Sequence, residues 1–176
     1  MDILLLKPGD DDFAGNFSVD SKVEGSTETS FSGCIGITSM RFGIEQQVSN
    51  DFSNSARTSG RPHFNDIVLE KRNDQSSLML YAACLRVIPI GRDNEVTQIF
   101  ALRSKGRHGE GGTLTHLYTI ELTNAIVGSI ETRFDDEQGL VDQFTLNFTD
   151  IRWEYSSQKD GTIGQFGWSL IKNRLI

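Results

Sequence analysis

The stretch from Leu114 to Tyr155 constrains the fold of this chain most strongly, because apolar residues recur there at every second position. Tyr118, Ile120 and Leu122 follow this spacing in its first half. Successive side chains of a β-strand point to opposite faces, so a period of two predicts a sheet with one buried face. The polar segment 133–139 then separates this first run from a second one.

The second run changes phase between Phe148 and Ile151. A β-bulge near residues 149–150 would absorb this change and bend the strand, as closed or strongly curved sheets require. We therefore predict a small β-barrel of antiparallel strands around the two runs. Leu146 and Trp153 occupy apolar strand positions, so we expect both side chains in the core.

Further strands are predicted on both sides of this stretch, where short apolar runs lie between turn residues. They span residues 3–6, 31–48, 64–69, 96–102 and 166–171. The alternation within 31–48 changes phase near Ser39, which predicts a bend there.

One helix is predicted, over residues 76–85. Residues 73–76, Asn-Asp-Gln-Ser, form a helix-start signal. Leu78, Ala82 and Leu85 recur at helical spacing, so we expect this face to pack against the sheet. Two further residues widen the same face: Tyr81 and Cys84. The fold class is thus mainly β, with one flanking α-helix.

The length and charge of the chain limit its possible roles. Its 176 residues suit one domain, 1–176. The 17 Lys and Arg residues against 24 Asp and Glu give a net charge of -7, which argues against binding to nucleic acid. No segment approaches the roughly 18 apolar residues of a membrane span, so no membrane insertion is expected. The start of the chain carries Asp2 and only a short apolar run, so export through a cleaved signal peptide is not expected.

Residue patterns for a cofactor or metal site are weak. The glycine-rich segment 106–112 lacks the Gly-Lys-Ser/Thr ending of a phosphate loop and opens no predicted helix. The three histidines show no ligand spacing and are expected on the surface or in turns: His63, His108 and His116. We therefore predict no metal and no cofactor. Cys34 and Cys84 lie in apolar surroundings and are expected as two buried thiols.

The sequence also lacks a recognisable catalytic constellation. There is no Gly-x-Ser-x-Gly motif, and neither cysteine has the context of an activated thiolate. Glu121 and Glu131 lie on predicted strands, where carboxylates are normally solvated; paired acids for glycoside hydrolysis stay open, although nothing points to them. Four aromatic residues at strand positions are expected in the core rather than on a base-stacking platform: Trp153, Tyr155, Phe166 and Trp168. We predict that the protein is not an enzyme.

Seven segments of the second part of the chain share their order and spacing with a known family: residues 64–71, 76–78, 82–84, 118–122, 126–130, 144–155 and 167–173. The region that contains them, from Phe64 onward, makes up about two-thirds of the chain. These segments together resemble the haemolysin-coregulated protein (Hcp) family, the tube proteins of bacterial type VI secretion systems. The resemblance implies a small β-barrel with a flanking helix, of which six copies form a ring around a channel.

The same resemblance implies partners and a location. The rings stack into a tube that a contractile sheath drives outward together with a spike, and small effector proteins travel in the channel. The tube assembles in the cytoplasm and is secreted by the machine itself, without a cleaved signal. Two alternatives stay open: a tail-tube protein of a phage-like contractile particle, and an unrelated β-barrel enzyme.

The polar segment 49–61 is the candidate contact region between subunits. It is rich in Ser and Asn and lacks apolar periodicity, and a loop this long is usually either flexible or used for binding. The resemblance equates it with the extended family loop that reaches neighbouring subunits. The predicted contact residues are Asn50, Asp51, Phe52, Ser53, Asn54 and Arg57. Phe52 either docks in a neighbour's pocket as an aromatic anchor or packs onto its own domain.

Overall fold

The computed structural model describes residues 2–13, 15, 23–24, 31–48, 60–91, 95–105, 113–157 and 161–176. The first half contains β1 (Asp2–Lys7), the short 3₁₀ helix η1 (Asp11–Phe13), β2 (Val23–Glu24), β3 (Ile35–Ile37), β4 (Ser39–Arg41), β5 (Ile44–Glu45), β6 (His63–Phe64), β7 (Ile67–Arg72) and α1 (Gln75–Arg86). The second half contains β8 (Thr97–Lys105), β9 (Thr113–Thr123), β10 (Ile126–Asp135), β11 (Gly139–Asn147), β12 (Asp150–Ser156), β13 (Ile163–Ser169) and β14 (Arg174–Leu175).

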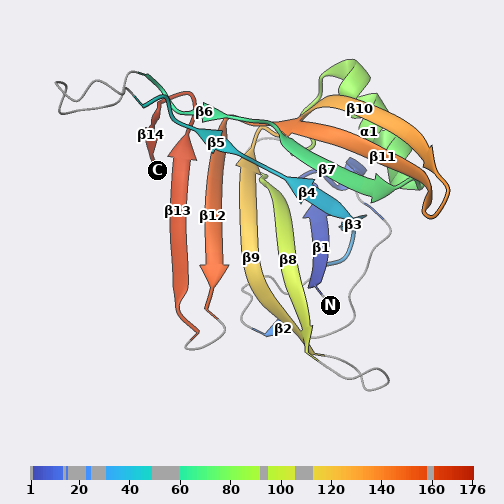
Figure 1. The fold of residues 1–176 in the computed structure, drawn as a ribbon, viewed down its shortest axis with the longest axis horizontal. Coiled ribbons are helices and arrows are strands. Elements are labelled where there is room, and N and C mark those ends of the chain that lie inside the picture. The colour runs from blue at the N-terminus through green and yellow to red at the C-terminus, as the bar shows by residue number, and fades with distance from the viewer. Residues whose placement is uncertain are drawn as a thin grey trace.

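The strands form two main sheets, with the helix beside the smaller one (Figure 1). The 8-stranded sheet has the order β14-β13-β12-β9-β8-β1-β3, with β2 paired to β9, and the 4-stranded sheet has the order β10-β11-β7-β4. β5 and β6 form a separate pair. Every ladder in the described residues is antiparallel except the short one between β2 and β9. The mainly β, antiparallel fold with one flanking α-helix is thus confirmed, although its ladders do not close into one continuous barrel.

The chain passes directly between the two sheets at three places: at Thr38, which joins β3 to β4, and at two adjacent corners. Residues 124–125 connect β9 of the large sheet to β10 of the small one, and residues 148–149 connect β11 back to β12. Thr149 N donates a hydrogen bond to Thr123 O (3.0 Å), which holds the corners together. The bulge predicted near residues 149–150 is therefore wrong, because the phase change there marks a passage from one sheet to the other.

Register shifts lie elsewhere, between Ala101 and Leu102 of β8 and between Val127 and Ser129 of β10. The bend predicted near Ser39 is confirmed, since β3 ends at Ile37 and β4 begins at Ser39. There Thr38 N and Oγ1 both donate to Glu70 O (2.8 and 3.1 Å).

Two apolar clusters form the core. The larger lies between the sheets and includes Ile67, Leu122 and Leu146, which confirms Leu146 as a core residue. The smaller lies on the other side of β1 and β8, where the rings of Phe31 and Phe100 meet edge to face with centroids 5.0 Å apart. β1 and β8 are therefore covered by apolar side chains on both faces.

The helix α1 begins as predicted but buries a different face. Asp74 is its N-cap and accepts a hydrogen bond from Ser76 N (2.8 Å), and Ser77 Oγ accepts one from Asp74 N (3.0 Å), which completes a capping box. Leu80 and Ala83 are fully buried in the large core, whereas Leu78 and Leu85 point to solvent. The predicted packing face was wrong because the buried side contains small and polar residues that a hydrophobic pattern does not detect.

Candidate assembly surfaces

A buried polar network positions α1 on the 4-stranded sheet. Lys71 of β7 is completely buried, and its Nζ donates hydrogen bonds of 2.8 Å to Asp74 Oδ1, Ser77 Oγ and the carbonyl oxygen of Arg72. A buried ammonium is costly unless it is paired and hydrogen-bonded. The three acceptors therefore tie the start of α1 to the end of β7.

Asp142 of β11 accepts the remaining hydrogen bonds of this network. Its carboxylate accepts hydrogen bonds from Ser77 Oγ (2.5 Å), Thr132 Oγ1 (2.6 Å) and Asn73 Nδ2 (3.0 and 3.1 Å), and Lys71 Nζ lies 3.8 Å away. Burial raises the pKa of Asp142, but these hydrogen bonds and the Lys71 charge outweigh it, so its pKa lies below the usual value. Asp142 thus stays ionised and connects α1 with both β10 and β11.

Because the network fixes α1, it also determines which helical face is exposed. Leu78 and Leu85 are 65% and 85% exposed, and Met79 is also exposed. Val87, which caps the end of the helix, is 66% exposed. We call these four residues together with the half-buried Ala82 the helix stripe.

A second apolar surface lies at the junction of β5, β9, β12 and β13. We call it the aromatic groove; it has a volume of about 490 Å³ and is lined by Phe42, Gly43, Ile44, Tyr118, Trp153 and Phe166. The ring centroid of Trp153 lies 6.1 Å from that of Phe42 and 5.5 Å from that of Phe166. Burial against these neighbours raises the pKa of the Tyr118 hydroxyl.

The aromatic residues expected in the core divide between core and surface. Trp153 and Trp168 are half-buried and pack against the large core. Tyr155 and Phe166 are exposed, so their predicted burial was wrong. The eight-stranded sheet extends beyond the smaller sheet there (Figure 1), so about half of each of these side chains stays exposed.

One edge of the eight-stranded sheet lacks the usual protection against strand pairing. β14 pairs only with Trp168 and Ser169 of β13, and Ile176 N donates to Gly167 O (3.2 Å). The stretch Ile163–Phe166 has a ladder partner on one side only among the described residues. Residues 161–168 contain no charged residue and no proline, and the register with β12 contains no bulge. An exposed edge strand of this kind readily accepts another strand.

The other edges are protected. β10 carries Glu131, Arg133 and Asp135 and contains a register shift after Val127. β3 and β4, at the remaining edges, are three residues long. Charges, bulges and short length all discourage the addition of a further strand.

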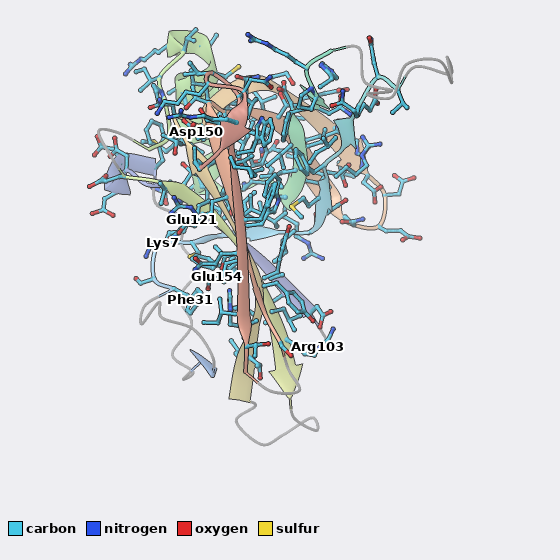
Figure 2. The ribbon with its side chains drawn as sticks, turned by 90° about the vertical axis from the view of Figure 1, so that its left-hand side faces the viewer. Lys7, Phe31, Arg103, Glu121, Asp150 and Glu154 are labelled. Atoms are coloured by element: carbon cyan, nitrogen blue, oxygen red, sulfur yellow. The ribbon has the colours of Figure 1, made fainter. Side chains whose placement is uncertain are left out.

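Charged side chains of the eight-stranded sheet form separate pairs along the strands. Figure 2 shows Glu121, Glu154 and Arg103 at successive heights along the sheet. Arg103 forms a two-pronged ion pair with Asp2 (3.0 and 3.2 Å). Glu121 accepts from Gln98 Nε2 (3.0 Å), whereas Glu131 lies on the smaller sheet, so the two glutamates do not share a site.

The histidine and cysteine positions within the described residues do not form a metal centre. In the described ranges, no group of three His, Cys, Asp or Glu side chains could hold a metal ion. His116 is buried, contrary to the surface position expected, and its Nε2 lies 2.5 Å from Thr119 Oγ1. Burial lowers the pKa of His116, and the charge of Glu154 opposes this effect. Cys34 is a buried thiol and Cys84 a half-buried one, and no disulfide joins them.

The contact residues predicted in the segment 49–61 lie outside the described residues, and so does His108. They are Asn50, Asp51, Phe52, Ser53, Asn54 and Arg57. The sequence interpretation did not identify the aromatic groove or the Lys71–Asp142 network. The uncharged stretch 161–168 was a usable signal for the exposed edge of β13.

None of the described helices is long and apolar enough to cross a membrane.

Comparison with solved structures identifies the fold. A structure described as a type six secretion system protein is 14% identical and covers 100% of both chains with a TM-score of 0.68. Hcp1 from Salmonella typhimurium is 16% identical, with 99% of each chain covered and a TM-score of 0.64. Hcp3 from Pseudomonas aeruginosa is 18% identical, with 93% of this chain and 95% of that chain covered and a TM-score of 0.57. No curated protein matches the sequence.

The sequence itself matches the family model described as "Type VI secretion system effector, Hcp" over residues 17–155. This range contains strands of both sheets and the helix, and it leaves out β1, η1, β13 and β14. The resemblance noted in the sequence is thus confirmed. The chain belongs to the Hcp family of the type VI secretion system.

Proposed function

We propose that the protein is a structural subunit of the inner tube of a type VI secretion system. Six copies form a ring around a channel, and rings stack into a tube that is assembled in the cytoplasm and exported. The tube contacts a contractile sheath and a spike, and its channel holds small effector proteins. The role is structural and requires no catalytic step.

The family match over residues 17–155 carries this proposal. It is supported by a fold that extends over nearly the whole length of solved Hcp structures. The family is one of secretion tube proteins, which favours a type VI tube over a phage-like tail tube. It also disfavours an unrelated β-barrel enzyme.

The exposed edge of β13 supports self-assembly. Ile163 to Phe166 offer backbone hydrogen-bonding groups on an edge without charge, proline or bulge. Strand addition at such an edge joins it to a different surface of the next subunit, and such head-to-tail contacts close into rings.

We propose that the segment 49–61 supplies additional contacts between subunits. Its candidate contact residues are Asn50, Asp51, Phe52, Ser53, Asn54 and Arg57. Phe52 is the aromatic residue among them, and aromatic anchors often dominate interface energies.

The mass of the protein in solution tests the proposal. Light scattering and sedimentation velocity at several concentrations should give about six times the subunit mass of 19.6 kDa. Negative-stain images of the same sample should show rings with a central hole. A monomer at tens of micromolar, with no rings in the images, would exclude the proposed role.

A further inference from the structure

The exposed side of α1 is as apolar as a side that normally packs inside a protein. Leu78, Ala82 and Leu85 recur at positions i, i+4 and i+7, while Leu80 and Ala83 fill the core on the opposite side. The exposed side of a surface helix is normally polar. The subunit alone covers only one of the two faces.

Val87 at the end of the helix provides an independent observation. It has a φ of 54°, in the left-handed region, so that Val87 N donates to Cys84 O (3.3 Å) and Ile88 N donates to Ala83 O (3.1 Å). Glycine or asparagine usually occupies such a position, and a β-branched residue there is a strained exception. The other two described non-glycine residues with positive φ are Asn124 and Asn173. Val87 adds an exposed apolar side chain to the helix stripe, although its left-handed conformation strains the end of the helix.

A surface of complementary character lies at the opposite end of the molecule. In Figure 1 the long axis is horizontal, with α1 near its right end and β5, β12 and β13 toward its left. The helix stripe is a convex apolar surface, whereas the aromatic groove is a shallow and open apolar surface. The single charged residue of α1 is Arg86, next to Leu85, and the exposed Glu45 follows Ile44 at the groove. Apolar surface and charge therefore match between the two ends.

We propose that the helix stripe of one subunit docks into the aromatic groove of the next copy, with Arg86 facing Glu45. This inference rests on the proposed ring and assigns the surfaces that close it. The two surfaces differ and lie at opposite ends of the subunit, so the contact is heterologous and leads from copy to copy. Each copy covers the stripe of one neighbour and offers its own stripe to the other.

Substitution of Leu85 tests the apolar contact. Leu85→Lys preserves helix propensity and places a cation at the helix C-terminus, where it is favourable, so the subunit should melt at the wild-type temperature when both are measured below the concentration of assembly. The subunit concentration at half-assembly should rise by roughly tenfold or more, because a buried leucine contact is lost. Phe134→Lys is the matched control, since Phe134 is 71% exposed and lies outside both surfaces. Normal assembly of Leu85→Lys would show that another partner covers the helix stripe. Equal weakening of assembly by both variants would show that the effect is unspecific.

Val87→Asn separates the role of the stripe in assembly from its effect on folding. Asparagine tolerates the left-handed conformation, so the thermal midpoint of the subunit should rise while ring assembly weakens. A stabilised subunit that assembles at the wild-type concentration would contradict the proposal, because Val87 would then strain the end of the helix without contributing to assembly.

Cross-linking tests which surfaces meet. A variant with Arg86→Cys, Glu45→Cys and Cys84→Ser, treated with a short bismaleimide, should give a denaturing-gel ladder that extends beyond the dimer. The two variants with a single new cysteine should give no ladder. If the ladder ends at the dimer, or if no ladder forms, the pairing of the helix stripe with the aromatic groove is wrong. Wild-type rings would in that case still support the proposed function. A wild-type protein that is monomeric throughout would instead overturn the proposed function.

Discussion

Asp142 offers the most direct test of how the helix is held. We expect Asp142→Ala to destabilise the subunit by about 3–5 kcal/mol, the usual cost of breaking a buried ion pair by removing one partner. The structure accounts for this magnitude. Ser77, Thr132 and Asn73 lose their shared acceptor, and the buried Lys71 loses a second negative charge 3.8 Å away. The buried Ser77 hydroxyl left without an acceptor costs about 1–3 kcal/mol, whereas the exposed Thr132 and Asn73 can bond to water instead. Lys71 keeps Asp74 as its counter-charge.

Urea unfolding, followed by the fluorescence of Trp153 and Trp168, measures this loss. With a slope of about 2 kcal/mol per molar urea, the midpoint should fall by about 2 M at unchanged slope. All variants should be compared at one subunit concentration, because assembly stabilises the folded state by mass action. Asp136→Ala removes an exposed carboxylate in the turn after β10 and should change stability by less than about 0.5 kcal/mol.

The pH dependence adds a second criterion. The pKa of Asp142 lies below its ordinary value of 3.8 in the folded state, so its contribution is present above that value and is lost as the pH falls through the folded pKa. The difference between wild type and Asp142→Ala should therefore shrink at strongly acidic pH. If Asp142→Ala unfolds at the wild-type urea midpoint at pH 7, the network is not what holds α1 in place.

Three further results are expected. Trp153→Ala should cost about 2–4 kcal/mol because the half-buried ring contacts both the core and Phe166; an unchanged urea midpoint would place the ring outside the fold's packing. A Gly/Ser linker in place of residues 50–58 should leave circular dichroism and thermal melting unchanged but weaken ring closure or stacking in sedimentation; stable rings at the wild-type concentration would make the loop a mere connection. The thermal midpoint should fall as the pH decreases below 6.5, the ordinary pKa of histidine, because burial lowers the pKa of His116 and the unfolded state binds the proton first. His116→Gln should reduce this fall of the thermal midpoint. If the variant shows the wild-type pH profile, other groups cause the fall.

Local sequence signals predicted the helix and most strands of this fold. The contacts between elements that are distant in the sequence could not be predicted from such signals. The start of α1 was predictable because Asp74 and Ser77 satisfy the first backbone amides of their own helix. The passage at residues 148–149 was mistaken for a bulge because period-two spacing reports facing but not which sheet a strand joins. Lys71 reads as a solvated strand residue until Asp142, 71 positions later, is placed beside it.

The candidate surfaces show the same limit. The hydrophobic spacing of Leu78 and Leu85 was correctly seen but assigned to the inside of the subunit. A periodic pattern indicates that a face avoids water, and it does not say whether the cover comes from the same chain or from another. The aromatic groove could not be predicted, because it combines residues from four strands that are distant in sequence.

The two corners between the sheets have a mechanical consequence. Only two residues connect β9 to β10 and only two connect β11 to β12, and Thr149 is bonded to Thr123 across the corners. Sliding of one sheet over the other would therefore have to stretch covalent backbone at these two neighbouring points, in addition to disturbing the packed core between the sheets. Thr38 joins the edge strands β3 and β4 of the two sheets away from these corners, so it also resists opening of the sheets about this seam. A push along the strands is thus transmitted by the backbone itself, and the subunit responds to it as a stiff block.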